Sequence, residues 1–155
     1  MSAELPATDD APASPEASET VKLSFPLRPD LVYLGRMTAA AEATRAGFGF
    51  DQVEDLRLAI DELCITIAGE DDSDGRLDLV FEWTPDSIKV VGTLVATGRD
   101  LAQVPEPATV SGTGGPTPRE LSERILDALV DEHGLDNAGG APRGWMVLRR
   151  REGTS

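Results

Sequence analysis

Two runs of alternating apolar residues lie on either side of the tetrad TPDS at residues 84–87, and they limit the fold more than any other feature. Every second residue from Leu77 to Trp83 is apolar, and the alternation resumes between Ile88 and Leu94. A period of two is typical of a strand with one buried face, and Pro-Asp is typical of a tight turn. The sequence therefore predicts an antiparallel hairpin whose apolar face needs a covering layer.

Helical periodicity between residues 51 and 67 supplies a candidate for that layer. Asp51 is the expected N-cap, and Glu54 stands in the capping-box position three residues later. Apolar residues then recur at alternating intervals of three and four, as expected for one buried helix face. They are Val53, Leu56, Ile60, Leu63 and Ile67. The single cysteine, Cys64, falls within this stripe and is expected to be a buried core thiol.

A strand, an earlier helix and a closing strand are also predicted. Apolar residues alternate from Val21 to Phe25, and the text WMVLRRR at residues 145–151 ends the domain as a strand. The helix runs from Pro29 toward Gly47, which is the expected stop. Its expected apolar side consists of Leu31, Leu34, Met37 and Ala41.

The last helix has the clearest start signal in the chain. Thr117 is the expected N-cap, Pro118 occupies the first helical position, and Glu120 closes a capping box. The expected apolar side consists of Leu121, Ile125, Leu126 and Leu129. His133 follows the helix and is expected to cap its carboxyl end.

The order of these elements is strand, helix, helix, strand, strand, long loop, helix and one or two strands. It predicts an α+β fold, a two-layer sandwich with helices on one face of a mixed or antiparallel sheet. We expect one domain over residues 21–151, with a disordered acidic tail at 1–20 and a short tail at 152–155. Residues 96–118 are rich in Gly, Pro, Ser and Thr and are expected to form a long flexible loop.

The net charge of −14, from 28 acidic and 14 basic residues, limits the possible partners. Such a chain repels phosphate backbones, so we expect no direct binding to nucleic acid or to an anionic membrane. A basic protein is the better match.

No signal peptide or membrane-spanning run is recognised, which predicts a soluble cytoplasmic protein. No metal site is predicted, because the acidic run at residues 70–74 lacks the spacing of a calcium loop and the chain has a single histidine.

The text FDQVEDLRLAIDELC at residues 50–64, with this element order, resembles the anti-sigma-factor and serine-protein-kinase family of the GHKL (histidine-kinase-like) ATPases. The resemblance covers about residues 21–150 and is greatest to actinobacterial anti-sigma factors of stress sigma factors. It implies a GHKL-type ATPase fold and partner switching. In that scheme the protein sequesters an alternative sigma factor, of the stress or sporulation type, until a STAS-domain anti-anti-sigma protein competes for it. A homodimer is implied as well.

The resemblance implies a first ATP box, Glu-x-x-x-Asn, on the helix at residues 51–67. The Glu of this box acts as a base, and the Asn holds Mg²⁺. Glu62 takes the first position and Thr66 takes the second, and their spacing projects both from one helix face. A threonine hydroxyl supplies a single neutral oxygen to a metal. The alternative is that Glu62 is a solvated side chain without a catalytic role.

The other two boxes implied by the resemblance depart further from the family pattern. The adenine-binding Asp-x-Gly has no counterpart before Asp100, and an unpaired buried adenine amine would cost roughly 1–3 kcal/mol. The phosphate-binding Gly-x-Gly is expected at the start of the last helix, where Glu120 and Ser122 stand instead. A weaker candidate for phosphate contact is the upstream cluster of Gly112, Gly114 and Gly115.

Three functions follow from this pattern. The favoured one is an anti-sigma factor that has kept the fold while its nucleotide boxes degenerated. An active ATP-dependent serine kinase that phosphorylates the STAS partner is the alternative. The third is a regulatory domain that binds another small ligand in the former ATP pocket. The helix from Pro29 and the loop at 96–118 are the expected partner surface.

Overall fold

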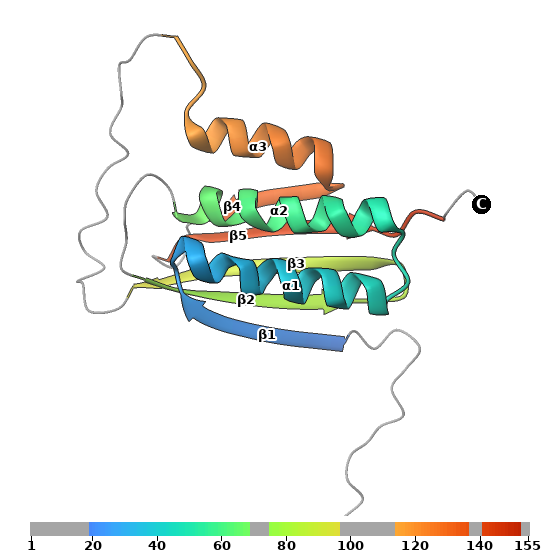
Figure 1. Cartoon of the computed structure of the whole chain (residues 1–155). Coiled ribbons are helices and arrows are strands. Elements are labelled where there is room, and N and C mark those ends of the chain that lie inside the picture. The colour runs from blue at the N-terminus through green and yellow to red at the C-terminus, as the bar shows by residue number, and fades with distance from the viewer. Residues whose placement is uncertain (1–18, 69–74, 97–113, 137–140, 153–155) are drawn as a thin grey trace, which may run out of the picture.

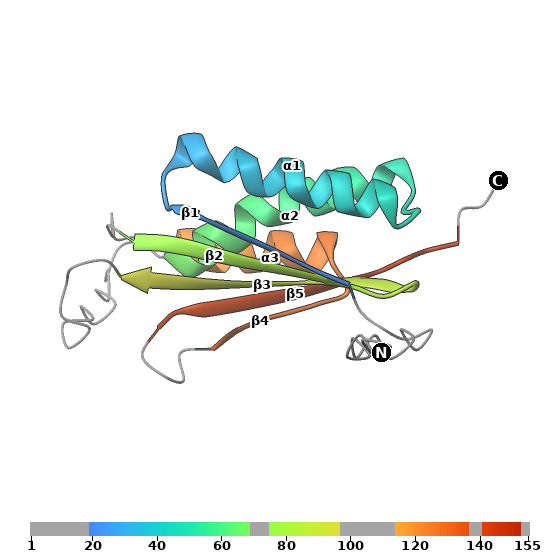
Figure 2. The same cartoon turned by 90° about the horizontal axis from the view of Figure 1, so that it is seen from below.

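The computed structural model describes residues 19–68, 75–96, 114–136 and 141–152, and these form two layers (Figures 1 and 2). Three helices cover one face of a five-stranded sheet of order β1-β2-β3-β5-β4, in which every neighbouring pair is antiparallel. The predicted α+β architecture is confirmed. The elements are β1 Glu19–Pro26, α1 Pro29–Arg45, α2 Phe50–Ala68, β2 Gly75–Trp83, β3 Ser87–Ala96, α3 Pro118–Leu129, β4 Glu132–Asp136 and β5 Arg143–Arg149.

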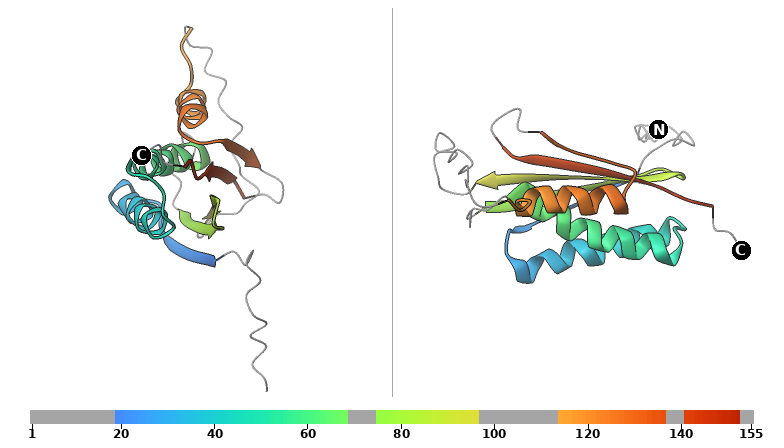
Figure 3. Two further views of the ribbon diagram at one scale, coloured as in Figure 1. Left: turned by 90° about the vertical axis from the view of Figure 1, so that its right-hand side faces the viewer. Right: turned by 90° about the horizontal axis from the view of Figure 1, so that it is seen from above.

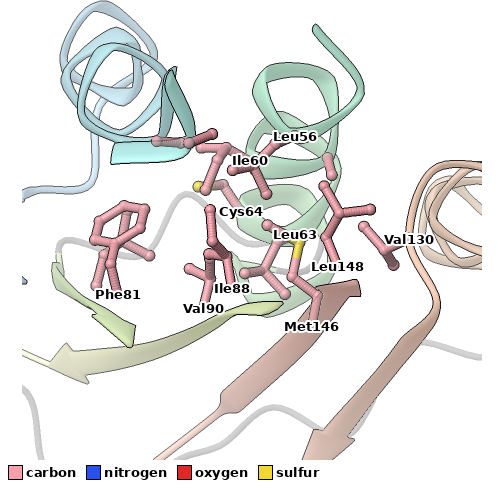
Figure 4. Close-up of a cluster of buried hydrophobic side chains, with 14 of the residues drawn as sticks. Leu56, Ile60, Leu63, Cys64, Phe81, Ile88, Val90, Val130, Met146 and Leu148 are labelled. Carbon is pink, nitrogen blue, oxygen red and sulfur yellow. The ribbon is translucent and has the colours of Figure 1, made fainter. Parts of the chain in front are cut away.

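The predicted hairpin is the centre of the sheet. β2 and β3 pair from Gly75 to Trp83, and the turn is closed by the N–H of Thr84, which donates to the carbonyl of Ser87 at 2.9 Å. The alternating apolar residues of both strands are buried on the side that faces the helices (Figure 4). β1 begins two residues earlier than predicted, so Glu19 and Thr20 belong to the sheet.

Helix α2 lies between α1 and α3 and covers the middle of the sheet (Figure 3). The predicted stripe is confirmed, because Leu56, Ile60, Leu63 and Ile67 are fully buried and Val53 packs at the margin of the core. The predicted N-cap is wrong. The helix starts at Phe50, and the carbonyl of Gly49 accepts the N–H of Val53 at 3.0 Å, so Asp51 lies inside the first turn. Glu54 pairs with Arg57 at 2.8 Å instead of closing a capping box.

Two glycines allow α2 to approach the sheet closely. Gly92 of β3 and Gly144 of β5 are register partners, so they lie side by side under α2. A Cβ at Gly144 would lie 2.9 Å from Cγ1 of Ile67 and 3.0 Å from Cδ1 of Leu63. A Cβ at Gly92 would lie 2.5 Å from Cδ1 of Ile67. The glycine pair therefore forms a slot that the Ile67 side chain fills.

Helix α1 packs through small residues. Its buried positions are Gly35, Ala39 and Ala43, which recur every four residues, whereas Met37 is about half exposed. The predicted apolar side is therefore wrong. A Cβ at Gly35 would lie 2.9 Å from Cδ1 of Leu79, which shows how closely the helix packs. Side chains as large as leucine or methionine do not fit at this distance, and the larger apolar residues lie partly or mostly in solvent.

The capping box of α3 is confirmed. The N–H of Glu120 donates to Oγ1 of Thr117 at 3.1 Å, and Oε2 of Glu120 accepts the N–H of Thr117 at 3.1 Å. The predicted apolar side is only partly right, because Ser122 and Leu126 are buried while Leu121 is half exposed. The helix is thus rotated toward α2 by more than its hydrophobic pattern indicates.

The prediction that His133 caps α3 is wrong. The helix ends at Leu129, and the N–H of Val130 donates to the carbonyl of Leu126 at 3.0 Å. His133 lies on β4, and its Nε2 is 2.6 Å from Oδ1 of Asp127. The histidine therefore joins β4 to the last turn of α3.

The side-chain amide of Gln52 fastens the start of α2 to the end of β5. Its Nε2 donates to the carbonyl of Arg149 at 2.7 Å, and its Oε1 accepts the N–H of Arg151 at 3.0 Å. Gln52 is buried, so these two bonds satisfy groups that water does not reach. This role has no signature in the sequence.

Replacing Gly144 with alanine tests the slot under Ile67. The new methyl group overlaps Ile67 and Leu63, so we expect the free energy of unfolding to fall by about 1–3 kcal/mol in urea denaturation. Gly49→Ala is the matched control and should be nearly neutral, because its Cβ would have no neighbour within 4 Å. Combining Gly144→Ala with Ile67→Ala should cost less than the sum of the single changes, since the new methyl group occupies part of the vacated space. Equal stability of the two glycine variants would contradict the slot.

Candidate functional site

Thr66 lies on the side of α2 toward β5, and Glu62 lies between that side and the outward side of the helix. Asp61 fixes the opposite side, because its Oδ2 pairs with Nη1 of Arg36 on α1 at 3.0 Å. Gln52 marks the side toward β5. Thr66 is fourteen residues after Gln52, which is close to four helical turns, so the two side chains leave the helix in nearly the same direction.

The Thr66 side chain is turned back onto its own helix. Its Oγ1 donates to the carbonyl of Glu62 at 2.8 Å, and only 3% of the residue is exposed. The hydroxyl hydrogen is therefore already used, and the oxygen is not presented to a metal from solvent. Among the described residues, no group of three or more His, Cys, Asp or Glu side chains could hold a metal ion.

The carboxylate of Glu62 is half-buried and has no hydrogen bond or ion pair with any residue in the described ranges. It projects from the same side of α2 as Thr66, as the spacing predicted. The arrangement supplies one free carboxylate beside a hydroxyl that is bonded to the helix backbone. The roles assigned to Glu62 and Thr66 stay predictions.

The start of α3 is the position at which the family would contact phosphate. Two of its free N–H groups are already paired within the capping box by Thr117 and Glu120, and the carboxylate of Glu120 repels an anion there. Ser122 is buried. Gly114, three residues before the cap, has φ +61° and is exposed together with Gly115, whereas Gly112 lies outside the described residues. Asp100 also lies outside them.

ATP and Mg²⁺ are the ligands that the resemblance implies for this region. The described residues do not fit this pair of ligands in the family's manner. The hydroxyl oxygen of Thr66 is buried, and a carboxylate lies at the phosphate end of α3. No chemical step is therefore derived through a bound nucleotide.

A second stripe on α2, which the sequence analysis did not identify, faces away from the core. It consists of Asp51, Asp55, Leu58, Glu62 and Ile65, and we call it the outer stripe. Its members are spaced by four, three, four and three residues, the same alternation as the core stripe. Leu58 is 55% exposed and Ile65 is 42% exposed. The regular spacing is the signal that could have revealed it.

Known proteins similar to this chain decide its family. No protein-family model matches the chain. The serine-protein kinase RsbW of Listeria monocytogenes serotype 4a (strain HCC23) is 33% identical over 129 residues, which cover 74% of this chain and 77% of the relative. The chain belongs to this family, the RsbW-type anti-sigma factors and serine-protein kinases of the GHKL class. The RsbW proteins of Bacillus subtilis (strain 168), 26% identical over 134 residues, and Listeria innocua serovar 6a, 29% identical over 126 residues, agree.

The sequence similarity to RsbW proteins extends over most of both chains. The Bacillus subtilis relative is matched over 79% of this chain and 81% of its own length. That relative is named as a serine-protein kinase. No helix in the described part of this family member is long and apolar enough to cross a membrane.

Cys64 is next to the first ATP box but faces α1 (Figure 4). The predicted buried thiol is confirmed, since 5% of the residue is exposed. Burial, together with the nearby Asp61 carboxylate and opposed by Arg36, raises the pKa of the Cys64 thiol to about 12. A thiol with this pKa is protonated at neutral pH and is a poor nucleophile.

Thiol labelling at pH 8 tests this environment. We expect Cys64 in the folded protein to resist alkylation and to react fully once urea unfolds the chain. Because the pKa is raised by folding from 9.0, the unfolded state loses its proton first, and this thiol makes the free energy of unfolding fall as pH rises above about 9. Rapid stoichiometric labelling of the native protein would contradict a buried thiol.

Proposed function

We propose that this protein is an anti-sigma factor that sequesters an alternative sigma factor in the cytoplasm and releases it when a STAS-domain anti-anti-sigma protein competes. The observation that carries the proposal is the match to RsbW proteins across about three quarters of each chain. The net charge of −14 agrees with a basic, DNA-binding partner, because opposite charges speed encounter and favour specificity.

We propose further that the nucleotide boxes are degenerate, so that binding of the sigma factor does not depend on ATP hydrolysis. The buried, backbone-bonded hydroxyl of Thr66 supports this, since an Asn at that position would offer a carbonyl oxygen to Mg²⁺. The Glu120 carboxylate at the start of α3 supports it as well.

The second candidate is an active serine kinase that phosphorylates the STAS partner. It is favoured by one observation, the free carboxylate of Glu62 at the position where the family places its base.

A homodimer is also predicted from the family resemblance, and sedimentation of the purified chain at several concentrations tests it.

The first experiment is co-purification of the tagged full chain with the sigma factors of its host. We expect one alternative sigma factor to be retained in nucleotide-free buffer, because the acidic chain and the basic partner are complementary. The housekeeping sigma factor serves as the specificity control. Failure to retain any sigma factor would reject the anti-sigma proposal.

Addition of Mg-ATP separates the two candidates. A ligand that binds only the native state raises the melting temperature, by an amount equivalent to about 2.7 kcal/mol at one hundred times its dissociation constant. We expect no shift at millimolar Mg-ATP and no transfer of labelled phosphate to a STAS protein. A clear thermal shift with phosphoryl transfer that Glu62→Ala abolishes would establish the kinase instead.

A further inference from the structure

The outer stripe of α2 has the geometry of a binding face for another helix. At 100° per residue its five positions, Asp51, Asp55, Leu58, Glu62 and Ile65, fall within an arc of about 80°. The arc is centred roughly 160° from the core stripe, so these side chains point away from the sheet. Two half-exposed apolar side chains and three carboxylates lie along about 21 Å of helix.

The three carboxylates of the outer stripe are free within the described part of the protein. The side-chain carboxylates of Asp51, Asp55 and Glu62 form no hydrogen bond or ion pair with any described residue. The other two acids of α2 behave differently, because Glu54 pairs with Arg57 and Asp61 pairs with Arg36. The negative charge of the stripe is thus left available to a partner.

Charge is distributed unevenly between the two faces of the molecule. Helix α2 carries five acidic residues and one arginine, a net charge of −4. The solvent face of the sheet carries five basic and four acidic residues, a net charge of +1. They are Lys22, Arg76, Lys89, Arg143 and Arg149 with Asp78, Glu82, Glu132 and Asp136. A basic partner is therefore attracted to the helical layer, and to α2 most strongly.

We propose that the outer stripe docks a basic amphipathic helix of the sigma factor, with Leu58 and Ile65 against its apolar side and the carboxylates against its Lys and Arg residues. This inference rests on the proposed anti-sigma function and names its contact surface. The spacing of four and three residues is that with which one helix packs its side chains against another.

Other occupants fit the outer stripe less well. An anionic membrane or a nucleic acid is repelled by its carboxylates. A second copy that met the stripe symmetrically would oppose like charges. A second copy that met it with the basic sheet face would make a head-to-tail contact that does not close into a dimer.

The docking has a consequence for how the sigma factor is inhibited. Basic side chains of a DNA-binding protein contact phosphates, and these contacts supply much of the affinity for DNA. Carboxylates of the outer stripe that pair with those side chains compete directly with promoter DNA. The anti-sigma factor would then exclude DNA as well as occupy the sigma factor.

The test compares binding of the co-purified sigma factor to the full chain and to Leu58→Lys/Ile65→Lys. Both side chains are exposed, so the variant should melt close to the wild type. We expect the dissociation constant to rise at least about tenfold, because lysine removes the apolar contact and adds a repelled charge. Val95→Lys on the sheet is the matched control, since Val95 is 41% exposed and Ile65 is 42% exposed.

A variant that removes charge tests the same surface independently and does not require the lysine variant to fold. Asp51→Asn/Asp55→Asn should slow association at low salt by about threefold or more and flatten its salt dependence. Glu82→Gln/Asp86→Asn removes the same charge from other parts of the described surface and should have little effect.

The outcomes separate this inference from the proposed function. If the wild-type chain binds no sigma factor, both fall. If it binds one and the stripe variants bind within about twofold of it, the inference alone is overturned. Loss of binding to a STAS protein with normal sigma-factor binding would also overturn it and would assign the stripe to the other partner.

Discussion

The position of α2 depends on the packing of the Ile67 side chain into the slot between Gly92 of β3 and Gly144 of β5. Because Gly92 and Gly144 have no side chains, α2 packs directly on the centre of the sheet and keeps Leu56, Ile60 and Leu63 fully buried. Helices α1 and α3 then flank α2 and do not cover its outward side (Figure 3). The family's first ATP box and the outer stripe are both positioned by this one contact.

Helix α2 has two faces with different properties, a buried core stripe and an exposed outer stripe. Its core stripe contributes to stability, so large changes there leave cavities that cost several kcal/mol. Exposed positions such as Leu58 and Ile65 tolerate substitution within about 0.5 kcal/mol, so partner recognition can change without loss of the fold. A protein of this family can therefore lose nucleotide chemistry on one side of α2 while the scaffold persists.

Local patterns predicted most of the fold. The hairpin, the core stripe of α2 and the capping box of α3 depend on neighbours in sequence, and all three are confirmed. The packed side of α1 was predicted wrongly, because the close approach of Leu79 to Gly35 selects small residues there. The roles of Gln52 and His133 depend on strands distant in sequence, which no local pattern reports.

The sequence predicted from which side of α2 the candidate site residues project, but it did not predict their hydrogen bonds. Spacing alone placed Glu62 and Thr66 on one side of α2, and the structure has them there. The bond from the Thr66 hydroxyl to the backbone of its own helix depends on a side-chain rotamer and on tertiary burial, which no sequence pattern reports. The regular spacing of the outer stripe can be read from the sequence. That its side chains are exposed follows only from the way the three helices pack.

Methyl NMR of the full chain, with and without its sigma factor and without nucleotide, tests the central claim most directly. The account predicts that the methyl resonances of Leu58 and Ile65 shift on binding, while those of Val95 on the sheet and of the buried Ile67 keep their positions. Perturbation confined to the sheet, or binding that appears only after Mg-ATP is added, would contradict it.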